Sequence, residues 1–354
     1  MNRTKLILGI LQNAPVILLI LIFLIFSILS PGFFSYKNLE NVAVQASYIG
    51  VIGVGMTFVL LTAGVDLSVG SNMYLSTAIV GTFLLGHGVP VWVGVLATVA
   101  LGLLMGLINA VVVTRFHVIP FIATFGMLFI ARGIGLSITQ SAVVSFPNSI
   151  LAIGSQRLFG LIPWPIVIFA LVVLLAHLTL TQTTYGRQIY AVGNDAETAK
   201  KAGIPTRRII ASVYLISGAC AAIGGLISVA QLGVASPTFG QGREFDAVAI
   251  AVIGGTSLFG GRGSVFPGTV LGAVLIQLIN AGLIFINVDI YLQPIVYALI
   301  IFLIVLLDTL RTGQLAKLER RYIRRVEKGK ISRPSLPAAQ PAAIPKDRGN
   351  TTDQ

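Results

Sequence analysis

Residues 91–113 read VWVGVLATVALGLLMGLINAVVV and contain no charged side chain. A helix needs about 20 consecutive apolar residues to cross the hydrocarbon core of a bilayer, so this stretch is long enough to span one. Similar apolar runs recur along most of the chain, which has 354 residues, 55% of them hydrophobic and only 10% charged. Because an ordinary soluble domain has roughly 25% charged residues, this composition excludes a water-soluble globular protein.

Taken together, the apolar runs predict an all-α polytopic membrane protein with about ten transmembrane helices. The strong alternation of membrane β-barrels is absent, and the 38 glycines suit the close packing of membrane helices. The candidate spans are residues 14–30, 48–63, 71–86, 91–113, 121–138, 165–180, 209–232, 247–258, 265–285 and 294–310. Two of these regions contain glycine-rich breaks, at 64–71 and 254–264, so discontinuous or re-entrant segments are expected.

Lysine and arginine are distributed unevenly over the predicted loops. With a cytoplasmic N-terminus, 18 of them fall on the inside segments and only Lys37, Arg157 and Arg243 fall on outside loops. The inside segments are residues 1–13, 114–120, 181–208, 259–264 and 311–333. The positive-inside rule therefore predicts that both termini are cytoplasmic.

The predicted organisation has four parts. A cytoplasmic segment at 1–13 precedes a transmembrane domain at 14–310, whose longest cytoplasmic loop is 181–208. Residues 311–333 combine apolar residues at helical spacing with many basic ones, which is typical of an amphipathic helix on a membrane surface. Residues 334–354 are rich in proline and alanine and are expected to be disordered.

Signatures of enzymes and metal sites are missing from the sequence. The Gly329-Lys330 pair is followed by Ile331, so it forms no phosphate-binding loop, and the three histidines lie far apart. No catalytic residue, metal site, cofactor or nucleic-acid partner is predicted. Arg132 is the clearest ionisable residue within the spans, and Asp66 lies in a break between two of them, which is sparse for a proton-coupled carrier.

The loop 181–208 contains the signals of a short helix. Asn194 is a potential N-cap, Glu197 completes a capping-box pattern, and Gly203 and Pro205 end the helix. Small residues recur at helical spacing in this segment: Ala196, Ala199 and Ala202. The loop is either a solvated connector or a docking surface for another protein, and we favour docking.

Four segments, in the same order and over about residues 15–310, resemble the permeases of sugar-importing ABC transporters of the ribose, xylose, arabinose and galactoside type. They are YGRQIYAVGNDAETAKKAGI at 185–204, GMTFV with GVDLSVGS at 55–59 and 64–71, PFIATFG with RG at 120–126 and 132–133, and EFDA with VIGGTSLFGG at 244–247 and 252–261. The first resembles the family's segment for coupling to the ATPase. Thr198, Phe125, Phe245 and Arg243 depart from the family pattern.

The resemblance implies a membrane permease that imports a monosaccharide and carries no ATPase of its own. The implied partners are a second permease copy or paralogue, an ABC ATPase subunit and an extracytoplasmic sugar-binding protein, and the implied location is the bacterial cytoplasmic (inner) membrane. The residues it marks for coupling to the ATPase are Gly193, Asn194, Asp195, Ala196, Glu197, Ala199, Ala202, Gly203 and Ile204.

A sugar is polar and uncharged, so hydroxyl and amide groups are the expected lining of its route. The candidates are Gln45, Thr57, Asp66, Ser68, Asn72, Thr124, Gln231 and Thr256. Ordinary hydrogen bonds between helices are the alternative role for most of these, and Asp66 and Ser68 can also cap the helix that follows them. Arg243, Glu244 and Asp246, in a predicted outer loop, are candidate contacts of the binding protein. For Glu244 and Asp246, the end of a solvated loop or a helix cap is an equal alternative.

Three rival interpretations remain from the sequence. The first is an ABC permease for another small solute, such as a nucleoside, an autoinducer sugar or a branched amino acid. The second is a secondary carrier that works alone, which should have more ionisable residues inside the membrane. The third is a membrane-embedded enzyme, for which no catalytic constellation exists.

Overall fold

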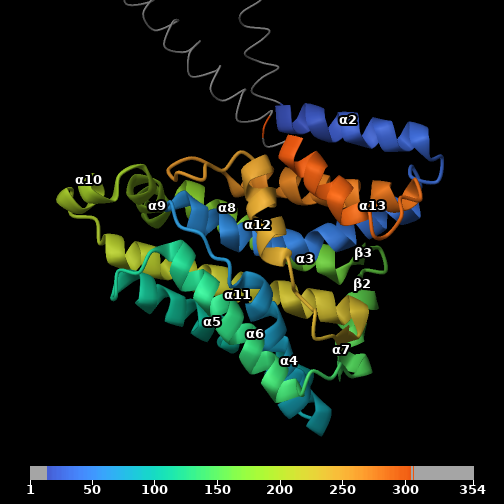
Figure 1. The fold of residues 1–354 in the computed structure, drawn as a ribbon, viewed down its shortest axis with the longest axis horizontal. Coiled ribbons are helices and arrows are strands. Elements are labelled where there is room, and N and C mark those ends of the chain that lie inside the picture. The colour runs from blue at the N-terminus through green and yellow to red at the C-terminus, as the bar shows by residue number, and fades with distance from the viewer. Residues whose placement is uncertain (1–13, 304–305, 307–354) are drawn as a thin grey trace, which may run out of the picture. The chain divides into compact units, whose positions relative to one another are not determined.

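The computed structural model describes residues 14–303 and residue 306, and this part of the chain is mostly helical (Figure 1). The helices are α2 (Ala14–Leu29), α3 (Tyr36–Leu61), α4 (Val69–Phe83), η1 (Leu85–His87), α5 (Val91–Thr114), α6 (Pro120–Thr139), α7 (Asn148–Ser155), α8 (Trp164–Gln182), α9 (Thr184–Asn194), α10 (Ala196–Lys201), α11 (Thr206–Leu232), α12 (Arg243–Ile253), η2 (Val265–Thr269), α13 (Val270–Phe285) and a last helix, Gln293–Leu303. Four two-residue strands form two antiparallel pairs: β1 (Val144–Ser145) with β4 (Val234–Ala235), and β2 (Arg157–Leu158) with β3 (Ile162–Pro163). The predictions for residues 1–13, 311–333 and 334–354 fall outside the described residues.

Each of the ten predicted apolar segments contains a helix. In the described part of the chain, six helices are long and apolar enough to cross a membrane: α3, α5, α6, α8, α11 and the continuous stretch Val265–Phe285. α3 begins at Tyr36, well before the predicted residue 48, and α12 has only 11 residues. The all-α membrane architecture is therefore confirmed, whereas the number ten and the cytoplasmic placement of the termini stay predictions.

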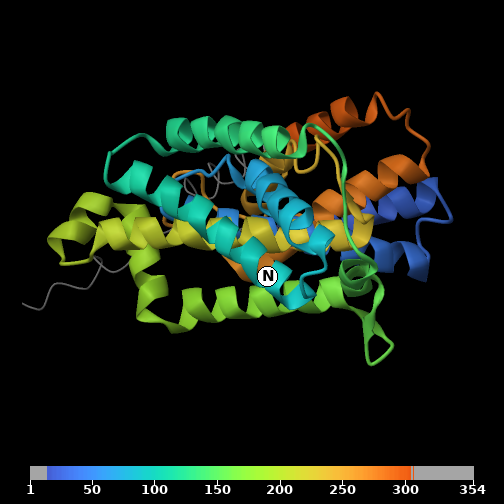
Figure 2. The same ribbon diagram turned by 90° about the horizontal axis from the view of Figure 1, so that it is seen from below.

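Burial distinguishes the central helix from the peripheral ones. In α3, 89% of the most apolar 18-residue window is buried, compared with 28% in α5, 22% in α6 and 28% in α8. A helix that is apolar on every face and exposes most of them suits a lipid surrounding, whereas one buried on every face lies in the protein core. α3 is accordingly enclosed by the rest of the chain. α5, α6 and α8 lie at the periphery of the bundle (Figure 2), and many of their apolar side chains are exposed.

α5 and α11 cross within backbone contact. A Cβ atom added to Gly102 would lie 2.5 Å from the carbonyl oxygen of Gly218, and one added to Gly218 would meet the carbonyl oxygen of Gly102. Gly106 lies equally close to the backbone of Tyr214. The Gly102-x-x-x-Gly106 pattern therefore serves packing inside the molecule, as glycines at this spacing commonly do in membranes.

The predicted break between the second and third apolar runs is real, because α3 ends at Leu61 and α4 begins at Val69. The helix-capping role predicted for Asp66 and Ser68 is wrong: Ser68 makes no side-chain cap bond, and the Asp66 carboxylate instead joins three elements. Ser68 donates its N–H (3.0 Å) and hydroxyl (2.6 Å) to Oδ1, and Ser217 of α11 donates its hydroxyl to Oδ2 at 2.8 Å. Asn109 of α5 donates to the Ser68 hydroxyl at 2.8 Å.

A loop at 236–242 follows β4 and leads into α12. Its Gly240 lies in backbone contact with Gly70 of α4. Arg132 of α6 fastens the loop: Nη1 donates to the carbonyl oxygens of Phe239 at 2.7 Å and Pro237 at 3.3 Å, while the guanidinium lies 4.9 Å from the ring centroid of Tyr74. The loop thereby sets where α12 begins.

We expect Gly218→Ala to destabilise the fold by about 1–3 kcal/mol, because its methyl group would collide with the α5 backbone. The matched control is Gly126→Ala in α6, where nothing lies within 4 Å of the added Cβ. Alanine favours helix over glycine, so this control should be neutral or slightly stabilising. Thermal unfolding of the two purified proteins in detergent measures the difference, and equal midpoints would contradict the packing argument.

Arg132→Met should release the loop at 236–242 while the surrounding helices stay folded. Two hydrogen bonds from a charged group are lost, each worth about 1.5–3 kcal/mol, so amide exchange in residues 236–242 should accelerate roughly tenfold or more. Hydrogen-exchange mass spectrometry of the reconstituted protein makes the measurement. Arg115→Met, an exposed arginine at the end of α5, is the control that should leave this loop unchanged.

Candidate functional site

α9 lies directly against both breaks in the helix bundle. Gly193 is buried so closely on α3 that an added Cβ would collide with the carbonyl oxygen of Leu61. That same oxygen accepts a hydrogen bond from the N–H of Gly261 at 3.0 Å, and the Tyr190 hydroxyl donates to the carbonyl oxygen of Gly263 at 2.9 Å. α9 therefore contacts both the end of α3 and the loop after α12, so a movement of α9 would displace both.

The short helix predicted in this loop is present as α10, but its cap is not Asn194. Asp195 is the N-cap, and its Oδ1 accepts from the N–H groups of Glu197 at 2.9 Å and Thr198 at 3.0 Å. Hydrogen bonds from Thr198 are the main reason that the pKa of the Asp195 carboxyl is lowered. The cap is therefore intact above the ordinary Asp pKa and is lost only as the pH falls through the lowered value. Glu197 pairs with Lys201 at 3.0 Å instead of completing a capping box.

The three alanines of the predicted stripe differ in burial. Ala199 is only 5% exposed and packs into the core of the chain, whereas Ala196 and Ala202 are exposed. Gly203 has φ of +84°, which ends the helix in the left-handed conformation that glycine favours. Among the predicted coupling residues, the exposed ones are Asn194, Asp195, Ala196, Glu197, Ala202 and Gly203, the buried ones are Gly193 and Ala199, and Ile204 is half-buried.

Most of the predicted route residues make hydrogen bonds between or within helices. Thr57 bonds Thr269 at 2.7 Å, the Asn72 amide donates to the carbonyl oxygens at the α5–α11 crossing, and Thr124 donates to Pro120. Gln231 donates to Val44, and Thr256 is buried with a hydroxyl that has no partner among the described residues. With Asp66 and Ser68 in their own cluster, Gln45 is the predicted residue that lines the large pocket described next.

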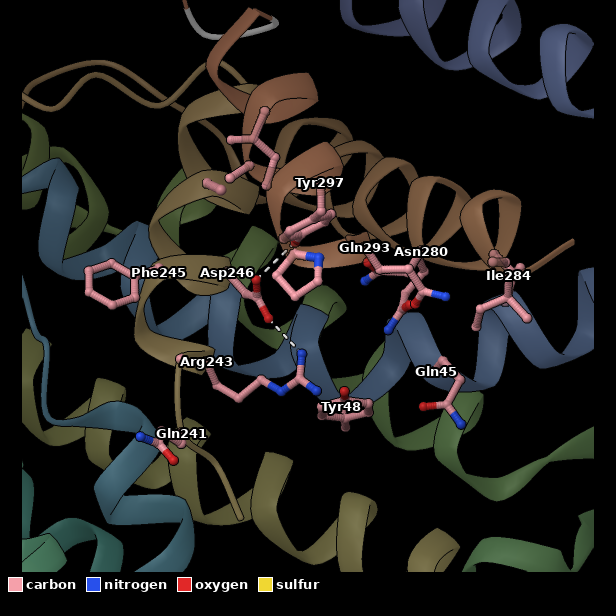
Figure 3. A pocket seen from close by; sticks show the side chains of 18 of the residues that line it. Gln45, Tyr48, Gln241, Arg243, Phe245, Asp246, Asn280, Ile284, Gln293 and Tyr297 are labelled. Carbon is pink, nitrogen blue, oxygen red and sulfur yellow. Dashed lines mark hydrogen bonds and ion pairs between the residues drawn. The ribbon is translucent and has the colours of Figure 1, made fainter. Parts of the chain in front are cut away.

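A pocket of about 1100 Å³, lined by apolar as well as polar side chains, opens between α3, α12, α13 and the last helix (Figure 3). We call it the polar pocket because of the polar groups that converge in it. Its polar lining is made of amides, tyrosine hydroxyls and one pair of opposite charges. These residues are Asn41, Gln45, Tyr48, Gln241, Arg243, Asp246, Gln277, Asn280, Gln293 and Tyr297. Such a lining offers many hydrogen-bond donors and acceptors to an uncharged polar ligand.

The two charged side chains of the pocket form an ion pair with each other. Arg243 Nη1 lies 2.6 Å from Asp246 Oδ2, and the Tyr297 hydroxyl donates to Asp246 Oδ1 at 2.9 Å. The Arg243 guanidinium also lies 5.5 Å from the ring centroid of Tyr48 (Figure 3). These contacts fix the carboxylate between α12 and the last helix.

The expected outer loop at residues 243–246 is wrong, because these residues form the first turn of α12. Glu244 is 6% exposed, with its carboxylate against Gly70, and Asp246 is 8% exposed. Of the three predicted contact residues, Arg243 keeps the largest accessible surface, with 36% of its side chain exposed.

The sequence did contain a signal for this pocket. Gln277, Asn280 and Gln293 are amides in otherwise apolar runs, where a polar side chain is costly unless it has a partner or a function. Gln277 is 7% exposed and lines the pocket, as do the other two. Their convergence becomes visible only when α13 and the last helix are placed side by side.

Comparison with known proteins identifies the family. Residues 38–307 match the family model described as branched-chain amino acid transport system / permease component. The chain is 40% identical over 302 residues to the ribose import permease protein RbsC of Escherichia coli (strain K12), covering 84% of this chain and 93% of that protein. It is 37% identical over 295 residues to the D-allose transport system permease protein AlsC of the same strain, with coverage of 83% and 90%.

A relative from another organism shows the same extent of similarity. The fructose import permease protein FrcC of Rhizobium meliloti is 33% identical over 303 residues, covering 83% of this chain and 84% of that protein. No solved structure matches the chain. The family model spans the helices that build the pocket and the α9–α10 segment, and the relatives cover more than four fifths of the chain. The chain therefore belongs to this family of multi-pass transport permeases.

Proposed function

We propose that the chain is the membrane permease of an ATP-driven importer for a monosaccharide, and that the polar pocket lies on the sugar's route. The observation that carries the proposal is the lining of this pocket by amide and hydroxyl groups, with its two charged side chains already paired to each other. Sugar hydroxyls both donate and accept, so amides such as Gln45, Asn280 and Gln293 suit them. Ribose, allose and fructose in the names of the relatives support this substrate class.

The α9–α10 segment is the proposed contact with a separate ABC ATPase. Its exposed residues, Asn194 to Glu197 with Ala202 and Gly203, form the candidate docking face, and the buried Gly193 and Ala199 attach that face to the rest of the chain. Because Gly193 touches α3 and the Gly261 loop at once, movement imposed by nucleotide binding reaches both breaks. The ATPase drives transport only by contacting the two states of the permease differently.

The remaining partners follow from the same proposal. A second copy or a paralogue of this chain would complete the pore, and an extracytoplasmic binding protein would deliver the sugar to the bacterial cytoplasmic membrane. Arg243 is the pocket cation with accessible surface, so a delivered sugar would meet it beside Tyr48. Six predicted route residues hold the helices around the route through their hydrogen bonds: Thr57, Asp66, Ser68, Asn72, Thr124 and Gln231. Thr256, whose buried hydroxyl has no partner among the described residues, stays a candidate for the route itself.

A branched-chain amino acid is the second candidate substrate. The family model carries that description, and the Arg243–Asp246 pair could separate to bind the carboxylate and ammonium groups of a zwitterion. Tyr297 and Tyr48 hold the pair closed, which favours the sugar. Co-purification from solubilised native membranes, followed by ligand screening of the recovered binding protein, distinguishes the two substrates. A chain recovered alone, with uptake that persists without ATP, would instead be a secondary carrier.

Gln45→Leu should lower the uptake rate about tenfold, because a hydrogen-bonding group worth roughly 1.5 kcal/mol is removed from the route. The matched control is Gln231→Leu, which removes an amide of the same type that lies outside the pocket and bonds only Val44. Uptake is measured in proteoliposomes that contain the partner subunits. Equal uptake by the two variants would place the sugar route elsewhere.

The double variant Ala196→Arg with Ala202→Arg should abolish ATP-dependent uptake while its melting temperature stays unchanged. Both alanines are exposed, so the added side chains block docking without entering the core. Ala199→Glu does not serve this purpose, because it would place a carboxylate at a buried position. The control, Lys201→Ala, removes only an exposed i, i+4 ion pair with Glu197 and should transport normally. Full uptake by the double variant would show that the ATPase docks elsewhere.

A further inference from the structure

A small hairpin precedes the membrane span α8. β2 and β3 pair in antiparallel register, with Arg157 opposite Pro163 and Leu158 opposite Ile162. The connecting residues place apolar side chains at the tip: Phe159 is 88% exposed, Leu161 72% and Ile162 47%. An apolar tip of this kind is costly in water, so its surroundings require an explanation.

The base of the hairpin is held firmly. Arg157 donates from Nη1 to Glu40 Oε2 at 3.0 Å and from Nη2 to Glu40 Oε1 at 2.6 Å, which joins the hairpin to the first turns of α3. Arg157 also donates to the Leu161 carbonyl oxygen at 3.3 Å, and the Trp164 N–H donates to Gln156 at 3.2 Å. A bidentate pair of this geometry fixes direction as well as distance, so the hairpin points in a fixed direction relative to α3.

Phe159 occupies a backbone conformation that does not suit it. Its φ is +52°, a left-handed value that glycine, asparagine or aspartate adopts more easily than a bulky aromatic residue. Gly160 also has a positive φ, +72°, and the Leu161 N–H donates to the Leu158 carbonyl oxygen at 3.1 Å, so the tight hairpin turn sets this conformation. The turn does not account for an aromatic side chain at this position, and the ring is exposed, so packing inside the chain does not account for it either.

The position of the hairpin favours lipid as the neighbour of its tip. Pro163 is followed by Trp164, the first residue of the apolar span Trp164–Gln182, so the hairpin lies at a membrane surface if α8 crosses the bilayer. Figure 2 shows the hairpin projecting sideways from the bundle, across the direction of α8, rather than extending it. The one charged residue of its strands, Arg157, is paired with Glu40, which leaves the tip without charge for a protein partner.

We propose that the β2–β3 hairpin is an interfacial anchor, whose tip of Phe159 and Leu161 inserts into the headgroup boundary of the leaflet at the outer end of α8. Aromatic and aliphatic side chains bind at this depth, and Trp164 beside the hairpin is typical of the same zone. The anchor holds the start of α3 at a constant height, because Arg157 links the two. It requires α8 to span the membrane, and it is independent of which solute is carried.

The test is a nitroxide label at Phe159→Cys in the full chain, reconstituted in phosphatidylcholine–phosphatidylglycerol nanodiscs. Collision rates with oxygen, which concentrates in lipid, and with a water-soluble nickel complex are compared by electron paramagnetic resonance. The matched control is Lys37→Cys, an exposed residue at the start of α3, and the unsubstituted chain reports any labelling of the buried Cys220. The oxygen-to-nickel ratio should be several-fold higher at position 159 than at position 37.

Equal ratios at the two positions would overturn the proposal. A water-like ratio at position 159 that changes only when the binding protein is added would overturn it in favour of a protein docking site. If the cysteine variant does not fold, Phe159→Trp keeps the ring, and quenching of its fluorescence by brominated lipids replaces the label. The chain has only 2 other tryptophans, and the difference from the unsubstituted chain isolates the new one. No added quenching would again reject the anchor.

Discussion

The α5–α11 crossing is the constraint on which the rest of the bundle depends. Gly102 and Gly218 let two backbones touch, and only at that distance do Asn109 and Ser217 reach the loop that carries Asp66. A buried carboxylate costs several kcal/mol unless hydrogen bonds replace its water, and its donors here come from α5, α11 and the start of α4. The crossing and the carboxylate therefore stabilise each other, and together they fix the non-helical segment between α3 and α4.

α3 connects the two functional ends of the molecule. Its C-terminal carbonyl at Leu61 contacts the α9 segment, and its N-terminal half supplies Gln45 and Tyr48 to the pocket. At 1.5 Å per residue these ends lie roughly 24 Å apart along a helix that is buried almost throughout. A rigid, enclosed element can carry a displacement over that distance because it has few ways to bend. The docking proposed at α9 and the sugar route proposed at the pocket would thus depend on the same helix.

The sequence predicts the helical membrane architecture, both glycine breaks and the α10 helix, because each depends on local signals such as apolar length, glycine and capping residues. The predictions from sequence are wrong where tertiary contacts decide between residues that are locally equivalent. Asn194 and Asp195 are both good caps by composition, and contact between Gly193 and α3 decides the register in favour of Asp195. The alanine stripe is regular in sequence, yet Ala199 turns inward because α9 and α11 leave a buried position there.

The polar pocket shows why route residues are the hardest to predict. Gln45 and Gln231 are both glutamines in largely apolar helices, but the pocket leaves the first open and the second bonds Val44. Nothing local separates these cases, since the difference lies in whether a neighbouring helix covers the amide. For Arg243 and Asp246, by contrast, a local signal is present. Their i, i+3 spacing is that of a helical ion pair, but the pair is not predicted because the segment is expected to be a loop. Helix α12 is short enough to start within the bundle, and this places its first-turn charges in the pocket instead of outside.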